Sequence, residues 1–319
     1  MSITTKLRKA FSGDTPKKRL KQYYKNFITY SYIDSRCKSP EQFQASITRL
    51  YHTIEKGLTY REYRPGFGKE NIEKLLTALE QYHQSGYDIS VFFYETAISC
   101  LKAYIEKNRM FGLEEPELER RVHILPGKTN GCGGTIEVTA PLHPENMTFE
   151  QTILSRHSIR HFSDKPVEIE RIGEAIRIAQ HTPSACNRQG WKTRIIINKE
   201  KQRIILANQN GNRGFGHEFD KILVITADLR AQQQSRELFQ AYIDGGMYAG
   251  NILNSLYFQG IGSVPLSAAL NTEQERKIRT VLNIDDAEVF ILFIGIGNYP
   301  AETVLTTKSE RRPAEYSTI

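Results

Sequence analysis

Three strong hydrogen-bond donors alternate along the short stretch RHSIRHF. In an extended chain, alternate side chains point to the same side. Arg156, Ser158 and Arg160 would then converge on one partner, while Ile159 and Phe162 anchor the segment. A pair of guanidinium groups suits the flat, multi-oxygen geometry of a carboxylate or a phosphate. The stretch therefore indicates an anion site, and the competing interpretation is a solvated basic turn ahead of a helix.

A second polar loop, TPSACNRQGW, follows a helical segment. Pro183 and Ser184 end that helix, and Asn187 and Gln189 then offer amide groups that both donate and accept hydrogen bonds. Such groups can bind the polar edge of a planar heterocycle with a polyol tail. The loop also carries the only tryptophan of the chain, Trp191, so a structural role is the competing interpretation.

Two further stretches contain residues that suit ligand binding. In QGIGSVPLSAAL, a Gly-x-Gly turn precedes Pro265 and several small residues, which would let backbone N–H groups approach a ligand closely. In the tail, KSERRP places Lys308, Arg311 and Arg312 together. A tight turn and a solvated tail are the respective alternatives.

The composition bounds the class of protein. The chain has 319 residues, which suggests two domains or one domain with a large extension, and 39% hydrophobic and 25% charged residues are ordinary for a globular protein. The apolar runs are too short for a transmembrane helix, and the N-terminal residues lack the apolar core of a secretory signal. Four dispersed cysteines form no CxxC pair, so neither a zinc site nor a disulfide framework is predicted, and a cytoplasmic location is expected.

The net charge of +7 is concentrated near the N-terminus. Eight Lys or Arg lie between Lys6 and Lys25, against one acid, Asp14. Such an arm could contact nucleic acid or an anionic membrane surface. Solvated ends of this composition are more common, so nucleic acid is not expected as a partner.

Residues 15–110 have the pattern of helices. Apolar residues fall at helical spacing along one face of FQASITRLYHTIEKGL, and further helices are expected at 69–83 and 90–108. In the first of these segments, His52 and Glu55 could ligate a metal, but no second pair is visible, so we predict a polar helix face and no metal site. Between 113 and 145, eight Pro and Gly residues indicate a linker, and the predicted domains are 1–145 and 146–319.

The second half mixes helices and strands. A helical start at TFEQTILSR leads into the basic stretch, and a helix is expected at 169–180. Buried strands are predicted at 193–198, 221–229 and 289–297. A long helix at 236–259 contains three glycines, which indicates close approach of another helix, a second subunit or a flat ligand. This order of elements predicts an α+β or α/β fold.

Taken in order, RHSIRHF, PSACNRQGW, DGGMYAGNIL, GIGSVPLSAAL and KSERRP resemble the nitroreductase family of FMN-dependent oxidoreductases. The resemblance covers residues 149–316, about half the chain. It implies an α+β fold with a central, mostly antiparallel sheet flanked by helices, in an intertwined homodimer with two FMN sites at the subunit interface. The helix around Asp244–Ala249 would form the dimer.

The resemblance also implies roles for individual residues. Arg156, Ser158 and Arg160 would hold the FMN phosphate, with His157 beside them, and Arg311 and Lys308 would close that site. The residues expected to lie along the flavin and ribityl chain are Pro183, Ser184, Asn187, Gln189, Pro265, Leu266, Ser267 and Ala268. The flavin carries out the redox chemistry, so no catalytic acid, base or nucleophile is predicted.

The function that follows is an FMN-dependent NAD(P)H oxidoreductase. A hydride would pass from NAD(P)H to FMN and then to a small organic acceptor, which could be a nitroaromatic, a quinone, an enone or a specialised metabolite. Two alternatives stay open: an O2-using flavoenzyme with little NAD(P)H activity, and a flavin-binding or flavin-less interaction protein. The loop Asn208–Phe219 is either part of the substrate pocket or lid, or a mobile surface loop, and Cys186 is either oxidisable or a packed thiol.

Overall fold

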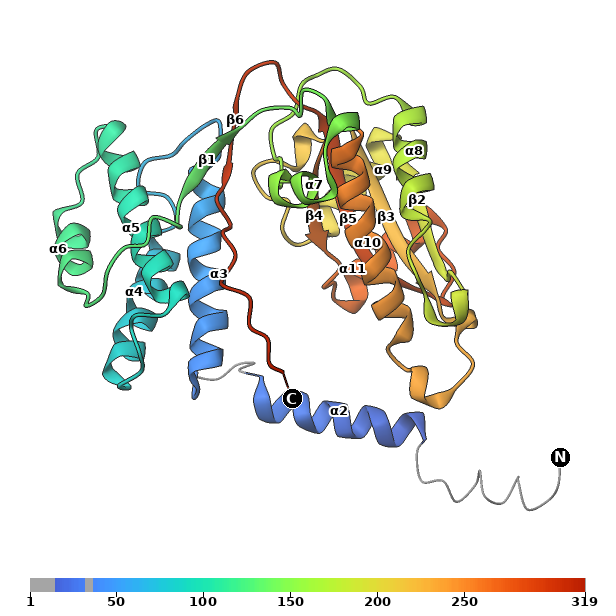
Figure 1. Cartoon of the computed structure of the whole chain (residues 1–319), viewed down its shortest axis with the longest axis horizontal. Coiled ribbons are helices and arrows are strands. Elements are labelled where there is room, and N and C mark those ends of the chain that lie inside the picture. The colour runs from blue at the N-terminus through green and yellow to red at the C-terminus, as the bar shows by residue number, and fades with distance from the viewer. Residues whose placement is uncertain (1–14, 32–36, 319) are drawn as a thin grey trace. The chain divides into compact units, whose positions relative to one another are not determined.

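The computed structural model describes residues 15–31 and 37–318, which form two compact units (Figure 1). The sheet unit comprises the described residues of the ranges 1–31 and 140–302. The helical unit comprises those of 32–139 and 303–319. The predicted domains 1–145 and 146–319 stay a prediction. In the structure the chain crosses between the units at 139/140, α2 belongs to the sheet unit, and the last strand belongs to the helical unit.

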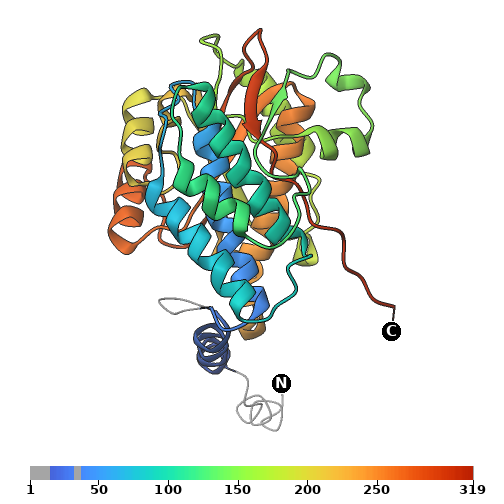
Figure 2. The ribbon, with the colours of Figure 1, turned by 90° about the vertical axis from the view of Figure 1, so that its left-hand side faces the viewer.

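Four helices build the helical unit: α3 (Pro40–Leu58), α4 (Lys69–Gln84), α5 (Phe92–Met110) and α6 (Pro116–Ile124). Ser39 caps α3 by accepting a hydrogen bond from the backbone N–H of Gln42, and Pro40 follows at the first helical position, where its missing N–H costs nothing. The predicted apolar face of α3 is buried against α4 and α5 (Figure 2). The helical character of this region is therefore confirmed.

The stretch predicted as a linker contains two regular elements, α6 and the strand β1 (Thr135–Val138). β1 pairs antiparallel with β6 (Val304–Thr307), close to the C-terminus. The many Gly and Pro residues of this stretch favoured a linker over regular structure. β1 in addition is only four residues long and pairs with a strand remote in sequence, so the local pattern does not predict it.

The core of the sheet unit is a four-stranded antiparallel sheet with the order β2-β3-β5-β4. Its strands are β2 (Trp191–Ile196), β3 (Lys221–Asp228), β4 (Ile261–Ser267) and β5 (Glu288–Asn298). Residues 221–227 of β3 are all buried, as expected of an apolar strand covered on both faces. The predicted α+β class and antiparallel sheet are confirmed.

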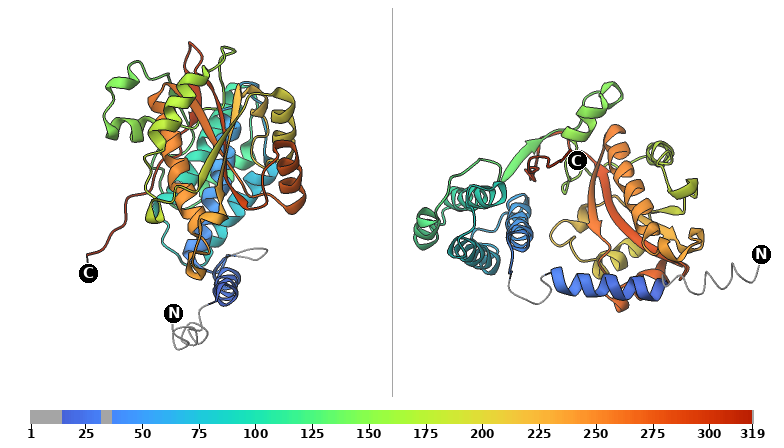
Figure 3. Two further views of the ribbon diagram at one scale, coloured as in Figure 1. Left: turned by 90° about the vertical axis from the view of Figure 1, so that its right-hand side faces the viewer. Right: turned by 60° about the horizontal axis from the view of Figure 1, so that its bottom comes forward.

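Helices cover both faces of this sheet (Figure 3). The glycine-containing α10 (Gln240–Phe258) packs across the strands, with α8 (Ile169–Ala179) against it. On the opposite face, α9 (Lys199–Asn208) and α11 (Thr272–Leu282) pack together. The short α7 (Phe149–Ser155) begins with a capping box between Thr148 and Gln151.

Two expectations need correction or qualification. The Gly-x-Gly stretch is the strand β4, and only Gly260, with φ 66°, lies in the turn before it. Pro265 fits within β4 because β4 is an edge strand, where one missing N–H breaks no ladder bond on the open side. Of the basic N-terminal arm, residues 1–14 lie outside the described residues, and the remainder forms α2 (Pro16–Tyr30). No helix in the described part of the chain is long and apolar enough to cross a membrane.

Candidate functional site

The predicted anion-binding segment is attached to the edge of the sheet. The backbone N–H of Ile159 donates to the carbonyl of Ser263 in β4 at 2.9 Å, and Ser158 forms a parallel bridge with the same residue. Ile159 and Phe162 are buried, so their predicted anchoring role is confirmed. The segment thus lies beside β4 with its backbone bonded to that strand.

Two glycines that face each other across β4 and β5 make this attachment possible. Gly262 pairs with Gly297, and the ring of Phe162 lies over both. A Cβ added at Gly297 would come within 2.6 Å of that ring, and one added at Gly262 within 3.1 Å. The bare patch of the sheet, which is the absence of side chains at Gly262 and Gly297, is therefore needed for Phe162 and its segment to pack against β4 and β5.

An acid from the Gly- and Asn-rich loop fixes the far end of the segment. Glu218 binds the ring Nδ1 of His161 at 2.7 Å and accepts the backbone N–H of Phe162 at 3.2 Å. We did not single out Glu218 from the sequence; its only signal was that it is the one acid among glycines and asparagines in that loop.

The two arginines of the segment have different environments. Arg160 is buried, with its guanidinium 5.6 Å from the ring centre of Phe215 and one Nη donating to the carbonyl of Ser158 at 3.3 Å. Arg156 is half-buried near Tyr299. Burial raises the pKa of Tyr299, Tyr257 adds to this effect, and the charge of Arg156 opposes it. The segment thus carries one arginine at each end, Arg156 and Arg160.

His157 lies between these arginines in the sequence and is also half-buried. Its ring Nδ1 is 2.9 Å from the carbonyl of Ser155. This contact fixes the ring against the end of α7.

The second predicted loop is held in a strained backbone conformation. Cys186, Asn187 and Gln189 all have positive φ, at 51°, 55° and 49°. Residues other than glycine adopt this left-handed region at a cost, and such strain concentrates where a loop is pre-organised for function. Asn187 is the one weak signal for this feature in the sequence, because Asn adopts positive φ more readily than other residues except glycine.

The same loop brings together Asn187 and Gln189, the two amide side chains predicted to bind the ligand. The Gln189 side chain donates to the Asn187 side-chain oxygen at 3.0 Å, and the Gln189 N–H donates to the hydroxyl of Ser184 at 3.0 Å. Asp244 of α10 accepts the N–H of Ala185 at 3.3 Å. Pro183 is exposed at the start of the loop.

An ion pair completes the anchoring of this loop. Arg188 pairs with Glu237 at 2.9 Å. The hydrogen bond from Arg188 is the largest influence that lowers the pKa of Glu237 to about 2. The loop is therefore fastened to both α10 and the turn before it.

The end of β4 is joined to the Asn208–Phe219 loop. Gln209 donates to the carbonyl of Ser267 at 2.9 Å, and Asn210 donates to that of Ala269 at 3.1 Å. Pro265 and Ala268 are half-buried, Leu266 is buried and Ser267 is exposed. The loop is thus bonded to the predicted flavin-lining strand, while a lid function stays a prediction.

The tail residues lie in the helical unit. The Nζ of Lys308 donates to the carbonyl of Gly131 at 2.6 Å, and Arg311 donates to the carbonyl of Ser309. The predicted closing of the phosphate site by Lys308 and Arg311 stays a prediction.

The polar face of α3 has a structural partner. The fully buried Glu55 contacts the ring Nδ1 of His52 at 3.1 Å and accepts the N–H of Gly134 at 3.1 Å. Among the described residues, no group of three or more His, Cys, Asp or Glu is placed to hold a metal ion. Glu55 instead fastens the glycine-rich loop before β1 to α3.

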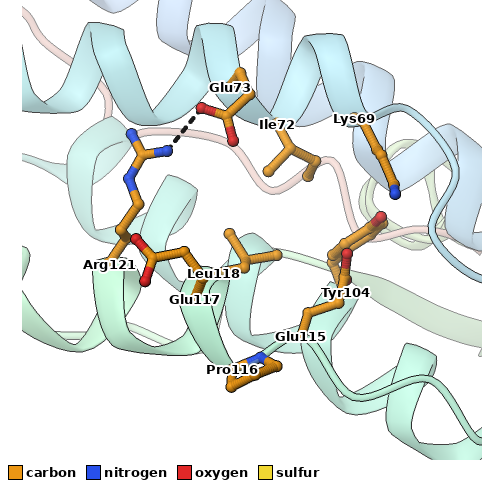
Figure 4. Close-up of a pocket in the computed structure, with 9 residues that line it drawn as sticks. All are labelled: Lys69, Ile72, Glu73, Tyr104, Glu115, Pro116, Glu117, Leu118 and Arg121. Atoms are coloured by element: carbon orange, nitrogen blue, oxygen red, sulfur yellow. Dashed lines mark hydrogen bonds and ion pairs between the residues drawn. The ribbon is translucent and has the colours of Figure 1, made fainter.

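The helical unit also contains a cavity of about 390 Å3 (Figure 4). Ile72, Leu118 and Tyr104 supply apolar lining, and Arg121 of α6 pairs with Glu73 of α4 at 2.6 Å across it. Arg121 also pairs with Glu80 at 3.0 Å. These ion pairs hold α6 against α4, which gives Arg121 a structural role.

The predicted flavin residues fall at opposite edges of one sheet. The Arg156–Arg160 segment and the end of β4 lie at one edge, and the Pro183–Gln189 loop leads into β2 at the other. Three strand spacings of ~4.8 Å place the two edge strands about 14 Å apart. Within one chain, the first and third stretches are therefore neighbours, and the second approaches the sheet from the other edge.

Residues 153–213 match the family model described as "Nitroreductase family". The C-terminal half contains a nitroreductase-family domain. A chloronitrobenzene nitroreductase of Comamonas testosteroni is 30% identical over 71 residues, covering 22% of this chain and 31% of that protein.

Two further proteins resemble parts of the nitroreductase-family domain. A Streptococcus pyogenes protein named as an NAD(P)H nitroreductase is 28% identical over 92 residues, covering 29% of this chain and 46% of that protein. A Desulfovibrio desulfuricans structure described as a nitroreductase in complex with FMN is 21% identical, with a TM-score of 0.44, and covers 51% of this chain and 91% of that one. The chain thus spans less than half of the two curated relatives.

Proposed function

We propose that this protein is an FMN-dependent oxidoreductase that transfers a hydride from NAD(P)H to FMN and then to a small organic acceptor. The observation that carries the proposal is the segment Arg156–Arg160, held along the edge of β4 by the Ser158–Ser263 bridge and by Ile159 and Phe162. Family membership and the order of the other stretches support it.

The residues present fit FMN. A phosphate near −2 needs several cationic and hydroxyl donors, which Arg156, Ser158 and Arg160 supply within five residues. The small side chains Ser267 and Ala268 at the end of an edge strand leave backbone N–H groups accessible to a planar ring. When bound, FMN supplies the two-electron chemistry.

The chain's own residues would then bind and orient FMN and tune its reduction. Arg156, Ser158 and Arg160 would hold the phosphate, with His157 beside them. From the other edge of the sheet, the pre-organised amides of Asn187 and Gln189 would bind the flavin or its ribityl chain. A backbone donor near the ring and nearby positive charge would stabilise negative charge on the reduced flavin.

We further propose a homodimer built on α10. Tyr242, Ile243 and Met247 are about half-exposed on one face of this apolar helix, and a Cβ added at Gly246 or Gly250 on that face would meet only open space. Large apolar residues beside glycines suit close packing of a second helix. In such a dimer, the Pro183–Gln189 loop of one copy would lie at the β4 edge of the other. The two groups of predicted flavin-binding residues, which lie at opposite edges of the sheet within one chain, would then meet in one site.

The absorption spectrum of the purified full-length protein tests the proposal, followed by NADH or NADPH without oxygen. We expect visible flavin bands that bleach on addition of the nicotinamide. Flavin that does not bleach would refute the NAD(P)H step. A protein that is colourless and takes up no added FMN would refute the proposed function.

The phosphate assignment has a matched test. Arg156→Gln should weaken FMN binding about 10- to 100-fold, since a hydrogen bond to a charged group contributes about 1.5–3 kcal/mol. Arg177→Gln is the control, because Arg177 is an exposed arginine of α8 that pairs only locally with Glu174. Equal FMN affinity of the two variants, measured by fluorescence titration, would contradict the assignment.

The dimer proposal is tested by Met247→Asp, with Lys201→Asp on the exposed face of α9 as the control. We expect the first variant to be monomeric by light scattering and to lose FMN, because its site would be incomplete. A dimeric Met247→Asp protein would contradict the placement of the interface on α10.

A further inference from the structure

The basic N-terminal arm has a feature that its charge pattern did not reveal. The helix α2 contributes no buried residue to the sheet unit. Its large apolar residues form one stripe at helical spacing: Leu20, Tyr23, Tyr24, Phe27 and Ile28. All five are exposed to a degree unusual for such residues, with Leu20 at 52%, Tyr23 at 50%, Tyr24 at 63%, Phe27 at 44% and Ile28 at 53%.

The charged residues of the helix are all basic. Lys17, Lys18, Arg19, Lys21 and Lys25 lie within residues 16–30, which contain no Asp or Glu. On a helical wheel, Lys18, Lys21 and Lys25 lie opposite or beside the apolar stripe. α2 therefore combines an exposed apolar face with a polar face whose charged residues are all cationic.

α2 is attached to the rest of the sheet unit at one end of α10. The ring of Tyr23 lies 4.8 Å from that of Phe239, just before α10, and α2 also contacts the short turn Ser235–Glu237. Thr15 caps the helix by accepting the N–H of Lys18, and Pro16 begins it. The start of the helix is thus defined by local sequence.

We propose that α2 binds the surface of an anionic lipid membrane, lying in its plane with the apolar stripe inserted at the headgroup level. An amphipathic helix with Lys and Arg on one face and aromatic and aliphatic residues on the other has this property. Tyr23 and Tyr24 suit the interface because their rings are apolar and their hydroxyls are polar. Anionic headgroups supply the negative charge that the polar face of α2 lacks.

Charge favours a membrane over a second copy as the occupant. Pairing two α2 helices would bring ten cations together with no acid. An anionic bilayer attracts each of these cations. This proposal is independent of the FMN chemistry.

The test is flotation of the full-length protein with vesicles of phosphatidylcholine alone or with one third phosphatidylglycerol. We expect binding only to the anionic vesicles. We also expect at least a 10-fold weaker partition at ~1 M salt than at ~0.1 M, because the screening length falls from about 10 Å to about 3 Å. No binding to anionic vesicles at the lower salt would overturn the proposal.

Paired variants identify the face responsible. Leu20→Ser with Phe27→Ser should lower partition onto anionic vesicles at least 10-fold. Gln22→Ser with Asn26→Ser, which alters the polar face by the same number of residues, should leave it unchanged. Both pairs are on an exposed helix, so circular dichroism should show the same fold.

Oligomeric state separates the two occupants. The membrane proposal is wrong if the apolar-face variant binds vesicles as the wild type does. It is also wrong if neither protein binds vesicles and the variant loses a self-association that light scattering detects in the wild type, because α2 is then a protein interface.

Discussion

Glu288 is a buried charged group whose removal should destabilise the sheet unit. Its carboxylate is 2% exposed at the start of β5 and links three strands. One oxygen accepts from Lys192 and Arg194 of β2, both at 2.9 Å. The other accepts from Arg194 at 2.8 Å and from the hydroxyl of Thr226 in β3 at 2.5 Å.

The magnitude follows from the pKa of this carboxyl. Burial opposes the charged form, but the hydrogen bonds from Arg194, Thr226 and Lys192 outweigh it and lower the pKa of Glu288 to about 2. Against an ordinary Glu value of ~4.3, this depression corresponds to about 3 kcal/mol of folding stability at neutral pH. Because the folded-state pKa is the lower one, this stability is present above about pH 5 and is lost as the pH falls toward 2.

We therefore expect Glu288→Gln to lower the free energy of unfolding by about 3 kcal/mol at pH 7, which is also the range for breaking a buried ion pair. With a urea m-value of about 2 kcal/mol/M, the midpoint should fall by about 1.5 M. The variant should also lose much of the wild type's acid sensitivity between pH 5 and pH 2.

Trp191 makes the measurement specific to the sheet unit. It is the only tryptophan of the chain, lies buried in β2 and stacks on Tyr248 at 4.8 Å, so its fluorescence reports unfolding of this unit. Flavin-free protein avoids stabilisation by ligand.

Glu273→Gln is the matched control. It removes the same charge from a carboxylate that is 56% exposed on α11, and it should change stability by less than about 0.5 kcal/mol. A Glu288→Gln shift no larger than that of Glu273→Gln, or an unchanged acid slope, would refute the reasoning.

Two further predictions concern the candidate site. Gly297→Ala should destabilise the sheet unit by about 1–3 kcal/mol, because its Cβ would overlap the ring of Phe162, whereas Gly173→Ala in open space on α8 should be neutral or stabilising in the same urea titration. Asn187→Gly should raise stability by up to about 1 kcal/mol, by relieving the positive φ, and should weaken FMN binding if the amide contacts the flavin. Equal losses for both glycine variants, or a less stable Asn187→Gly protein, would contradict these two accounts.

The sequence determined the local elements and the chemistry of the candidate site. The periodicity of α3 and the unbroken apolar run of β3 were sufficient, because both patterns record which faces are buried. The alternation of Arg156, Ser158 and Arg160 predicted an anion site because side-chain types are visible in sequence, and that site stays a prediction.

Only the tertiary structure decided how these pieces meet. The pairing of β1 with β6, the bare patch that Gly262 and Gly297 make for Phe162, and the hold of Glu218 on the first segment all join residues remote in sequence. Side-chain pattern carries no information about such partners. Positive φ at Asn187 and the uncovered apolar face of α2 were likewise invisible, since backbone strain and exposure are properties of the folded chain.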